Sequence, residues 1–149
     1  MKKILKKQAG FTLIEILIVI GIIAVLAAIV LVAVNPARQF AQANNADRSS
    51  DLNALLSAVG QMIIDDKGTI NSEITTTVQD ISSAEANLCA DLMPDYIPSM
   101  PQDPSSNNGV AITSCTTYNT GYTIVKDANG RITIAAPDAQ IGATITVTR

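Results

Sequence analysis

The 149-residue sequence contains no histidine and no tryptophan, and only 3% of its residues are aromatic. Without histidine, Ser-His-Asp and Cys-His catalysis are excluded, and the commonest metal ligand is missing. Charged residues make up 15% of the chain, well below the usual quarter. The length suits one ordinary domain and does not suit two large ones.

Charge is divided unevenly along the chain. Four of the ten basic residues lie within the first seven positions. From Phe11 onward the chain has six Lys and Arg and thirteen Asp and Glu. A body this acidic repels nucleic-acid phosphates, so we expect no direct binding of DNA or RNA.

An apolar run follows the basic segment. Residues 16–34 contain no charged or strongly polar side chain, which matches the roughly 20 residues that cross a bilayer as a helix. The preceding lysines predict that the N-terminus stays in the cytoplasm and that the rest of the chain is exported. The alternative is a secretory signal peptide, but signal cores run about 7–15 residues, shorter than this apolar run. A retained single-pass helix in the cytoplasmic membrane is therefore favoured.

The helix is predicted to continue beyond the apolar run. Residues 37–64 contain no proline, and an apolar stripe recurs there at spacings of three and four, formed by Leu52, Leu55, Leu56, Val59, Met62 and Ile63. With a kink or local break at Pro36, the segments suggest one helix of roughly 54 residues. The polar stretch 42–51 is either a solvated neck or a subunit contact, and Asp47 and Asp51 flank Arg48 at helical ion-pair spacing.

Glu15 does not suit a plain membrane anchor. A carboxylate near the bilayer interior costs about 2.5–3.5 kcal/mol, and a wet position at the headgroup level is the alternative. Residues 6–15 read Lys-Lys-Gln-Ala-Gly-Phe-Thr-Leu-Ile-Glu and combine a basic leader, Gly10, Phe11 and Glu15 with an unbroken apolar run. This combination closely resembles the processing site of a type IV prepilin, and the resemblance extends over about residues 1–35.

The resemblance implies a processing route. In this family a membrane-embedded prepilin peptidase cuts after the glycine, here Gly10, and methylates the new terminal amine, here on Phe11. The glutamate that matches Glu15 meets the terminal amine of a neighbouring subunit during assembly. Phe11 and Glu15 are four residues apart, roughly 6 Å along a helix, so a pair between subunits sets an axial stagger. Pairing of the two groups within one subunit is the alternative.

Small residues in the apolar run favour close packing between helices. Gly21, Ala24 and Ala28 fall on one helical face, where backbones approach closely, although alanine is simply common in such helices. Val32 stands where pilins and pseudopilins often have a proline. Any local melting of the helix in a filament is therefore expected to shift toward Asn35-Pro36 or to be absent.

The remaining chain is predicted to form a small α+β body. We expect a short strand over residues 74–78, a helix over 84–93 that begins with a capping-box pattern, and a proline-rich loop over 95–109. Three strand-like segments follow, with Asn129-Gly130 as a hairpin turn between the first two; they cover residues 118–125, 131–135 and 143–148. The apolar stripe of the helix needs an apolar partner, and one face of an antiparallel sheet supplies it. The resemblance to pilins implies the same architecture.

Cys89 and Cys115 are the only cysteines. Export favours a disulfide bond between them, as in many pilins, and two buried thiols are the alternative. Two cysteines without histidine are too few for a structural zinc site, and we expect no cofactor. Residues 100–104 are similar to the Pro-x-Asp-Pro segment of type II secretion pseudopilins, some of which bind calcium nearby. Residues 127–130 superficially match a calcium loop but lack its later glutamate, so a hairpin turn is favoured.

These observations divide the chain into a basic leader (1–10), a transmembrane and assembly helix (11–35), an amphipathic helix (36–67) and an exported body (68–149). The resemblance implies a structural subunit of a type IV pilus that polymerises with itself into an extracellular fibre for adhesion, motility or DNA uptake. Its partners would be the prepilin peptidase, an inner-membrane assembly platform with its ATPase, and membrane lipid before assembly. One alternative is a pseudopilin of a type II secretion or competence apparatus. The other, a membrane-anchored enzyme or sensor, is disfavoured because Asp91, Asp95 and Asp103 form no defined pair.

Overall fold

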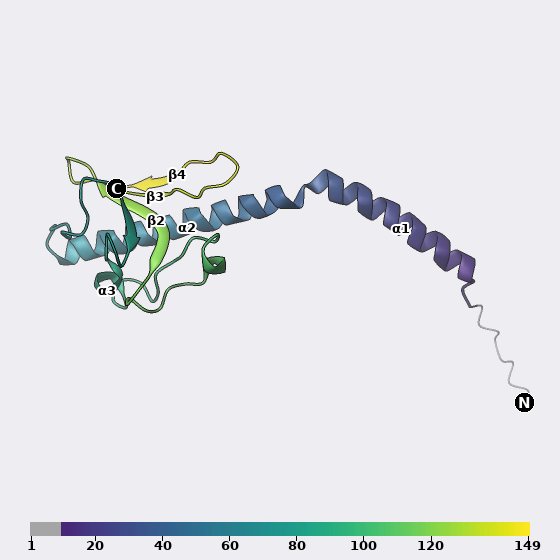
Figure 1. The fold of residues 1–149 in the computed structure, drawn as a ribbon, viewed down its shortest axis with the longest axis horizontal. Helices are drawn as coiled ribbons and strands as arrows, with labels where there is room; N and C mark the ends of the chain where they lie inside the picture. Colours follow the sequence, from purple (N-terminus) through teal and green to yellow (C-terminus); the bar gives the residue numbers. More distant parts are fainter. Residues whose placement is uncertain (1–9) are drawn as a thin grey trace, which may run out of the picture. The chain divides into compact units, whose positions relative to one another are not determined.

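The computed structural model of the chain describes residues 10–149 (Figure 1). Apart from Gly10, the predicted leader 1–10 lies outside the described residues. The chain divides into two compact units, one that ends at Gln39 and one that runs from Phe40 to Arg149.

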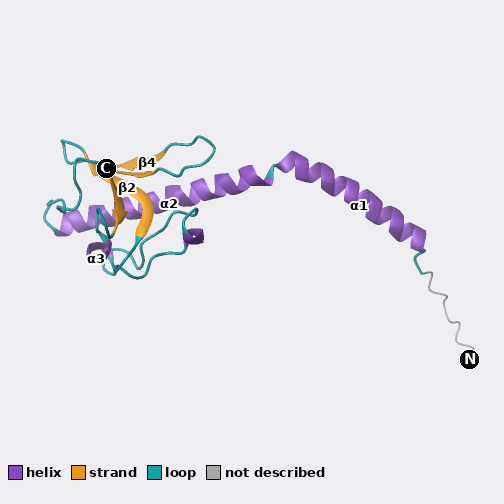
Figure 2. Ribbon diagram, in the orientation of Figure 1, coloured by secondary structure: helices purple, strands orange, loops and turns teal. Residues whose placement is uncertain are grey.

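Two helices replace the single long helix that the sequence suggests (Figure 2). Helix α1 spans Leu13–Val34 and helix α2 spans Pro36–Asp65, with Asn35 between them in the left-handed region at φ 44°. Of the two possibilities predicted at Pro36, a kink or a local break, the structure has the break, which divides the expected helix of roughly 54 residues in two. The cause is local: Pro36 disfavours helical geometry at the residue before it, and asparagine tolerates the left-handed conformation. The backbone N–H of Arg38 donates to both the carbonyl and the side-chain oxygen of Asn35, which also starts α2.

Helix α2 buries the predicted apolar stripe. Leu52, Leu55, Leu56, Val59 and Met62 are buried, and Ile63 is partly buried against them. The helix ends at Asp65, and the chain then reverses through Lys67 and Gly68, which both have positive φ. The backbone N–H of Gly68 donates to the carbonyl of Ile63 at 2.7 Å. The glycine stop that the sequence indicates is confirmed.

Four antiparallel strands form one sheet in the order β1-β2-β3-β4. Their bounds are Gln79–Ser82 for β1, Asn119–Lys126 for β2, Ile132–Ala136 for β3 and Ile145–Thr148 for β4. The three C-terminal strands agree with the predicted segments to within two residues. The Asn129-Gly130 turn between β2 and β3 is also confirmed, with Gly130 at φ 81° and its N–H donating to the carbonyl of Asp127.

Two predictions for residues 69–93 are wrong. The expected strand over 74–78 is not formed, and β1 follows it at Gln79–Ser82; Ile74 lies in a loop but is fully buried. The expected helix over 84–93 is reduced to α3, Cys89–Leu92. The capping-box pattern misleads because Ser82 belongs to β1, and the Glu85 carboxylate accepts from the backbone N–H of Asp80 at 2.6 Å.

The hydrophobic core lies between α2 and one face of the sheet. Alternate residues of β2 and β3 point into it, among them Tyr122, Ile124, Ile132 and Ile134. Burial of such a side chain contributes about 1.5–3 kcal/mol relative to exposure. The fold is therefore α+β and pilin-like: a long apolar N-terminal helix, then a helix packed on a small antiparallel sheet.

Candidate processing and assembly site

The predicted cleavage point is open to solvent. Gly10 and Phe11 precede α1 without regular structure, and Phe11 is 85% exposed. A peptidase must draw an extended backbone into its active site, and this accessible segment meets that need. Cleavage after Gly10 and methylation at Phe11 remain predictions.

Thr12 and Glu15 form a reciprocal cap at the start of α1. The Glu15 carboxylate accepts from the Thr12 backbone N–H at 2.7 Å and from the Thr12 hydroxyl at 2.8 Å. The Glu15 N–H donates back to the Thr12 hydroxyl oxygen at 3.2 Å. Thr12 is not among the residues predicted from the sequence, although a threonine three residues before a glutamate at the start of an apolar run is a recognisable capping signal.

This cap holds the carboxylate close to the future N-terminus. The Thr12 N–H that Glu15 binds lies one peptide unit from the nitrogen of Phe11, where cleavage creates a positive amine. The structure therefore places the acidic group next to the position of the new charge. Pairing of Glu15 with that amine, within one subunit or between two, remains a prediction.

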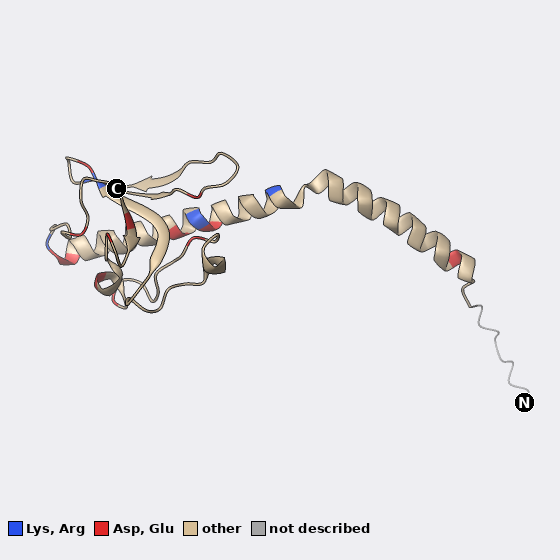
Figure 3. Cartoon of the chain, in the orientation of Figure 1, with Lys and Arg blue, Asp and Glu red and all other residues tan. Residues whose placement is uncertain are grey.

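Helix α1 has exposed apolar side chains along its whole length, and its ribbon carries one acidic position near its start and no basic one (Figure 3). It contains 22 residues, is long and apolar enough to cross a membrane, and buries none of them. Glu15 is its only charged residue. Gly21, Ala24 and Ala28 lie on α1, and the space around Gly21 is open to 4 Å. Their role in helix packing stays a prediction.

A buried ion pair fixes the body to the first half of α2. The guanidinium of Arg48 donates to the Asp103 carboxylate through Nε at 2.6 Å and Nη2 at 2.9 Å, and both side chains are fully buried. Nη2 also donates to the Ser105 hydroxyl and Nη1 to the Asn45 side-chain oxygen. Arg48 therefore does not pair with Asp47 or Asp51, and its face of the polar stretch 42–51 is not a solvated neck. The alternative of a subunit contact stays a prediction.

Gly121 makes room for this ion pair. Its φ is +78°, and a Cβ built on it would lie 2.8 Å from the Asp103 Cβ. A side chain here would push the Asp103 loop away from α2. No spacing in the sequence signals that Arg48, Asp103 and Gly121 meet, because 55 residues separate the first two.

The ionisation of Asp103 reflects two opposing effects. Burial by itself raises the pKa of a carboxyl group, but hydrogen bonds from Arg48 and the Ser105 backbone N–H outweigh it and hold the pKa of Asp103 below its ordinary value. The neighbouring Asp51 behaves in the opposite way. Asp51 lies on α2, and burial raises its pKa, although its carboxylate accepts from the Tyr122 hydroxyl at 2.7 Å.

Asparagines of α2 also bind the loop between β3 and β4. Asn45 donates to the carbonyl of Gln140 at 2.8 Å and accepts from its N–H at 2.9 Å, and Asn44 donates to the Gln140 side chain. Ile141 and Gly142 follow with positive φ of 52° and 68°, and the Ala143 N–H donates to the Gln140 carbonyl. A left-handed conformation costs an L-residue about 1–2 kcal/mol, and a β-branched residue rarely adopts it.

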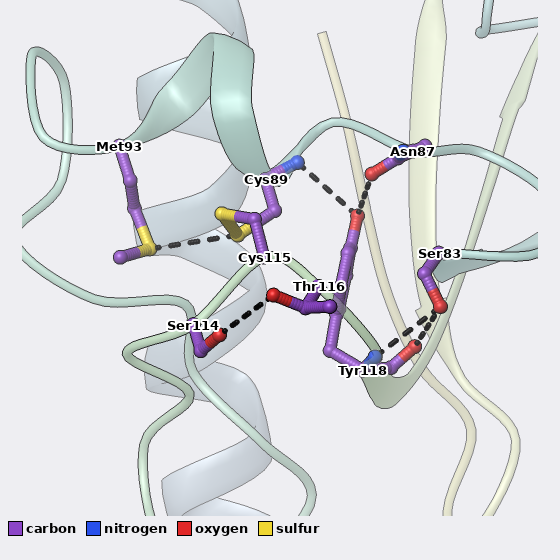
Figure 4. The surroundings of a disulfide bond; sticks show 8 residues. All are labelled: Ser83, Asn87, Cys89, Met93, Ser114, Cys115, Thr116 and Tyr118. Atoms are coloured by element: carbon purple, nitrogen blue, oxygen red, sulfur yellow. Dashed lines mark hydrogen bonds between the residues drawn. A yellow bond between two sulfur atoms is a disulfide. The ribbon is translucent and has the colours of Figure 1, made fainter.

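The expected disulfide bond joins Cys89 on α3 to Cys115, with their Cα atoms 5.5 Å apart (Figure 4). Beside it, the Tyr118 hydroxyl accepts from the Cys89 N–H and donates to the Asn87 side chain. The bond closes the proline-rich loop over 26 residues, which stabilises the body by about 3–4 kcal/mol in the chain-entropy model.

The candidate calcium residues already have protein partners. Both oxygens of Asp103 bind Arg48, and Oδ1 of Asp127 accepts the backbone N–H groups of Asn129 and Arg131 in the hairpin turn. Within residues 10–149, no group of three or more Cys, Asp and Glu side chains is arranged to hold a metal ion.

Comparison with known proteins identifies the N-terminal segment. A family model described as the prokaryotic N-terminal methylation motif matches residues 5–31. This motif is the class III signal of type IV pilins and pseudopilins. The chain therefore carries the processing signal of that class of membrane-anchored subunit. No curated protein and no solved structure matches the chain.

Proposed function

We propose that this chain is the structural subunit of a type IV pilus, cut after Gly10, methylated at Phe11 and polymerised through α1. The methylation motif over residues 5–31 carries the proposal. Two further features support it. Helix α1 exposes apolar side chains all round, which suits a membrane before assembly and a bundle of helices afterwards. The body has its own core, which suits the surface of a fibre.

The partners follow from this route. A prepilin peptidase removes the leader, and an inner-membrane platform with its ATPase draws processed subunits out of the lipid. Before assembly the chain crosses the cytoplasmic membrane once with its N-terminus inside, and afterwards it forms part of an extracellular fibre for adhesion, motility or DNA uptake. The proposal includes no cofactor, no enzymatic activity and no direct contact with nucleic acid.

A pseudopilin of a type II secretion or competence apparatus is the second candidate. The Pro-Gln-Asp-Pro segment at residues 101–104 favours it, because it is similar to a segment of major pseudopilins. Asp103 in this segment closes the loop onto α2 through Arg48, which gives the motif a structural role that serves either assembly.

An intact mass of the protein separates these functions. Fibres sheared from cells and the membrane fraction are measured side by side. A chain that starts at Phe11 with one added methyl group, abundant in the sheared material, supports the pilus. The same species confined to the membrane supports the pseudopilin, and an uncut chain in both fractions contradicts both proposals.

Glu15→Ala tests the assembly step. The substitution removes the carboxylate that would meet a terminal amine, so we expect the mass of the processed, methylated chain to be unchanged while sheared fibres are lost. Glu73→Ala removes an exposed carboxylate of the body and is the matched control, which we expect to leave both unchanged. Normal fibres from Glu15→Ala would contradict the assembly role.

A further inference from the structure

An apolar socket lies at the C-terminal half of α2. It has a volume of about 250 Å³, more than the roughly 150 Å³ of an apolar cavity that accepts benzene. The side chains that line it are mainly aliphatic, from Leu56, Val59, Ile63 and Ile64 of α2 and Ile132 of β3. Arg149 also lines it, with a guanidinium nitrogen 3.2 Å from the position of a Cβ on Gly60. We call this feature the α2 socket.

An apolar side chain is displayed at the opposite half of α2. Ile141, 55% exposed, occupies the first central position of the tight turn 140–143. This turn type has positive φ at both central positions and favours asparagine or glycine there, not a β-branched residue. Gln140 ties the turn to Asn44 and Asn45. Such a held, strained and exposed isoleucine suits an interaction surface. We call this feature the Ile141 tip.

The charges beside the two features are complementary. Asp138 is exposed three residues before Ile141, and Arg149 lines the socket. Among residues 10–149 the single ion pair is that of Arg48 and Asp103, so both groups are free to pair with a partner. The same chain therefore carries the apolar Ile141 tip close in sequence to the acidic Asp138, and the apolar α2 socket lined by the basic Arg149.

We propose that the Ile141 tip of one subunit inserts into the α2 socket of the next copy, with Asp138 facing Arg149. The inference rests on the proposed fibre and names a contact within it. The two features lie on different parts of the surface, so the contact joins unlike faces. A contact of this kind generates an open helical assembly unless its rotation closes a ring.

The placement along α2 gives the contact a direction. Asn44 and Asn45 hold the tip, and the socket is centred near Gly60, so the two are separated by roughly 23 Å at 1.5 Å per residue. Copies joined in this way are displaced along α2 by about that distance. The contact need not be strong alone, because subunits anchored side by side through α1 meet at high effective concentration.

Cysteine cross-linking in fibres tests the contact. Both native cysteines are joined to each other, so Ile141→Cys with Ile64→Cys introduces the only thiols. We expect mild oxidation of sheared fibres to yield a ladder of covalent multimers on a non-reducing gel, with neither single variant giving more than dimers. Val110→Cys with Ile64→Cys is the matched control, because Val110 is also apolar and 58% exposed, and we expect no ladder from it.

Ile141→Asn supplies an independent measurement. Asparagine suits the left-handed position better, so we expect the full-length subunit in detergent to unfold at the same or a higher temperature. We expect the yield of sheared fibres to fall about tenfold, the change that 1.4 kcal/mol produces. If the turn contributed only to the stability of the subunit, the unfolding temperature and the yield of sheared fibres would change in the same direction.

The outcomes separate the two proposals. Abundant wild-type fibres without cross-linked multimers, or with equal multimers from the control pair, overturn the contact and leave the pilus proposal standing. Cross-linking of the socket to a different protein also overturns it. Absence of wild-type fibres overturns the proposed function and this contact together.

Discussion

At the residue scale, Arg48 and Asp103 form the ion pair that fixes the Asp103 loop to α2. Each is fully buried, and within residues 10–149 no buried side-chain nitrogen or oxygen lacks a hydrogen-bond partner. A satisfied buried pair adds little net stability over an apolar one, but the loss of one partner leaves an uncompensated buried charge. The pair therefore determines how the Asp103 loop sits on the helix.

Arg48→Ala tests this view. We expect the free energy of unfolding to fall by about 3–5 kcal/mol, because the Asp103 carboxylate stays buried without its cation. Urea unfolding of the purified subunit, followed by circular dichroism, measures the change. Arg131→Ala removes an exposed arginine and is expected to change stability by less than about 0.5 kcal/mol. Arg48→Met combined with Asp103→Leu should recover most of the loss; a double variant as unstable as Arg48→Ala would contradict the charge argument.

Asp103 also predicts a dependence of stability on pH. Its folded pKa is lowered from the ordinary value, which is about 3.9 in an unfolded chain. As the pH falls below about 4, Asp103 binds a proton in the unfolded state but stays ionised in the folded state. The free energy of unfolding therefore decreases. Asp51, with a raised pKa, acts in the opposite sense. Urea midpoints between pH 7 and 3 should therefore fall less steeply for Asp103→Asn and more steeply for Asp51→Asn than for the unchanged chain.

Sequence reasoning succeeded for residues that act near one another in the chain. Gly10, Phe11 and Glu15 occupy a short motif, and the match of a family model to residues 5–31 confirms the recognition. It failed for Arg48, whose local neighbours Asp47 and Asp51 offered a plausible but wrong ion pair. The true partner, Asp103, is brought to α2 only when the sheet packs on the helix, and no local pattern encodes that distance.

At the element scale, the break between α1 and α2 depends on two adjacent residues. Asn35 takes a left-handed conformation, and Pro36 has no N–H to donate. This is the point in the described helices where the helical hydrogen-bond pattern is interrupted.

Asn35→Ala combined with Pro36→Ala should join the two helices. The backbone N–H groups of residues 35–38 then gain carbonyl acceptors four residues earlier. We expect amide hydrogen exchange of these residues in detergent to slow at least tenfold, measured by mass spectrometry on peptides that cover them. The single variant Ala37→Ser, one residue away, is the control and should leave the exchange unchanged. Fast exchange in the double variant would show that the break has another cause.

The elements themselves were unequally predictable. Residues 52–63 of α2 and strands β2 and β3 show periods of 3.6 and 2 residues, and their buried positions confirm them. Residues 69–93 have neither period over a useful length. There, tertiary contacts decide the secondary structure. Ile74 is buried although it lies in a loop, and the Glu85 carboxylate accepts a hydrogen bond from the Asp80 N–H instead of capping a helix.

At the scale of the whole molecule, the body contains its complete core. The buried hydrophobic residues begin at Leu52 and end at Ala136, and α1 contributes none of them. The polar network that holds the Asp103 and Gln140 loops begins at Asn44. A division of the chain before Phe40 therefore cuts no core contact, whereas a division after Arg48 removes the cation that Asp103 needs.

Two truncated chains test this argument together. Residues 40–149 should be a soluble monomer with a cooperative thermal transition and an intact Cys89–Cys115 bond, because the core and the polar network are both retained. Residues 50–149 keep the whole apolar stripe of α2 but lack Asn44, Asn45 and Arg48. We expect this shorter chain to be less stable, because the Asp103 and Gln140 loops lose their hydrogen-bond partners on α2. Urea unfolding of both chains measures the difference. Equal stability of the two chains would show that the first turns of α2 do not hold the body, and the ion pair would then lose the structural role assigned to it.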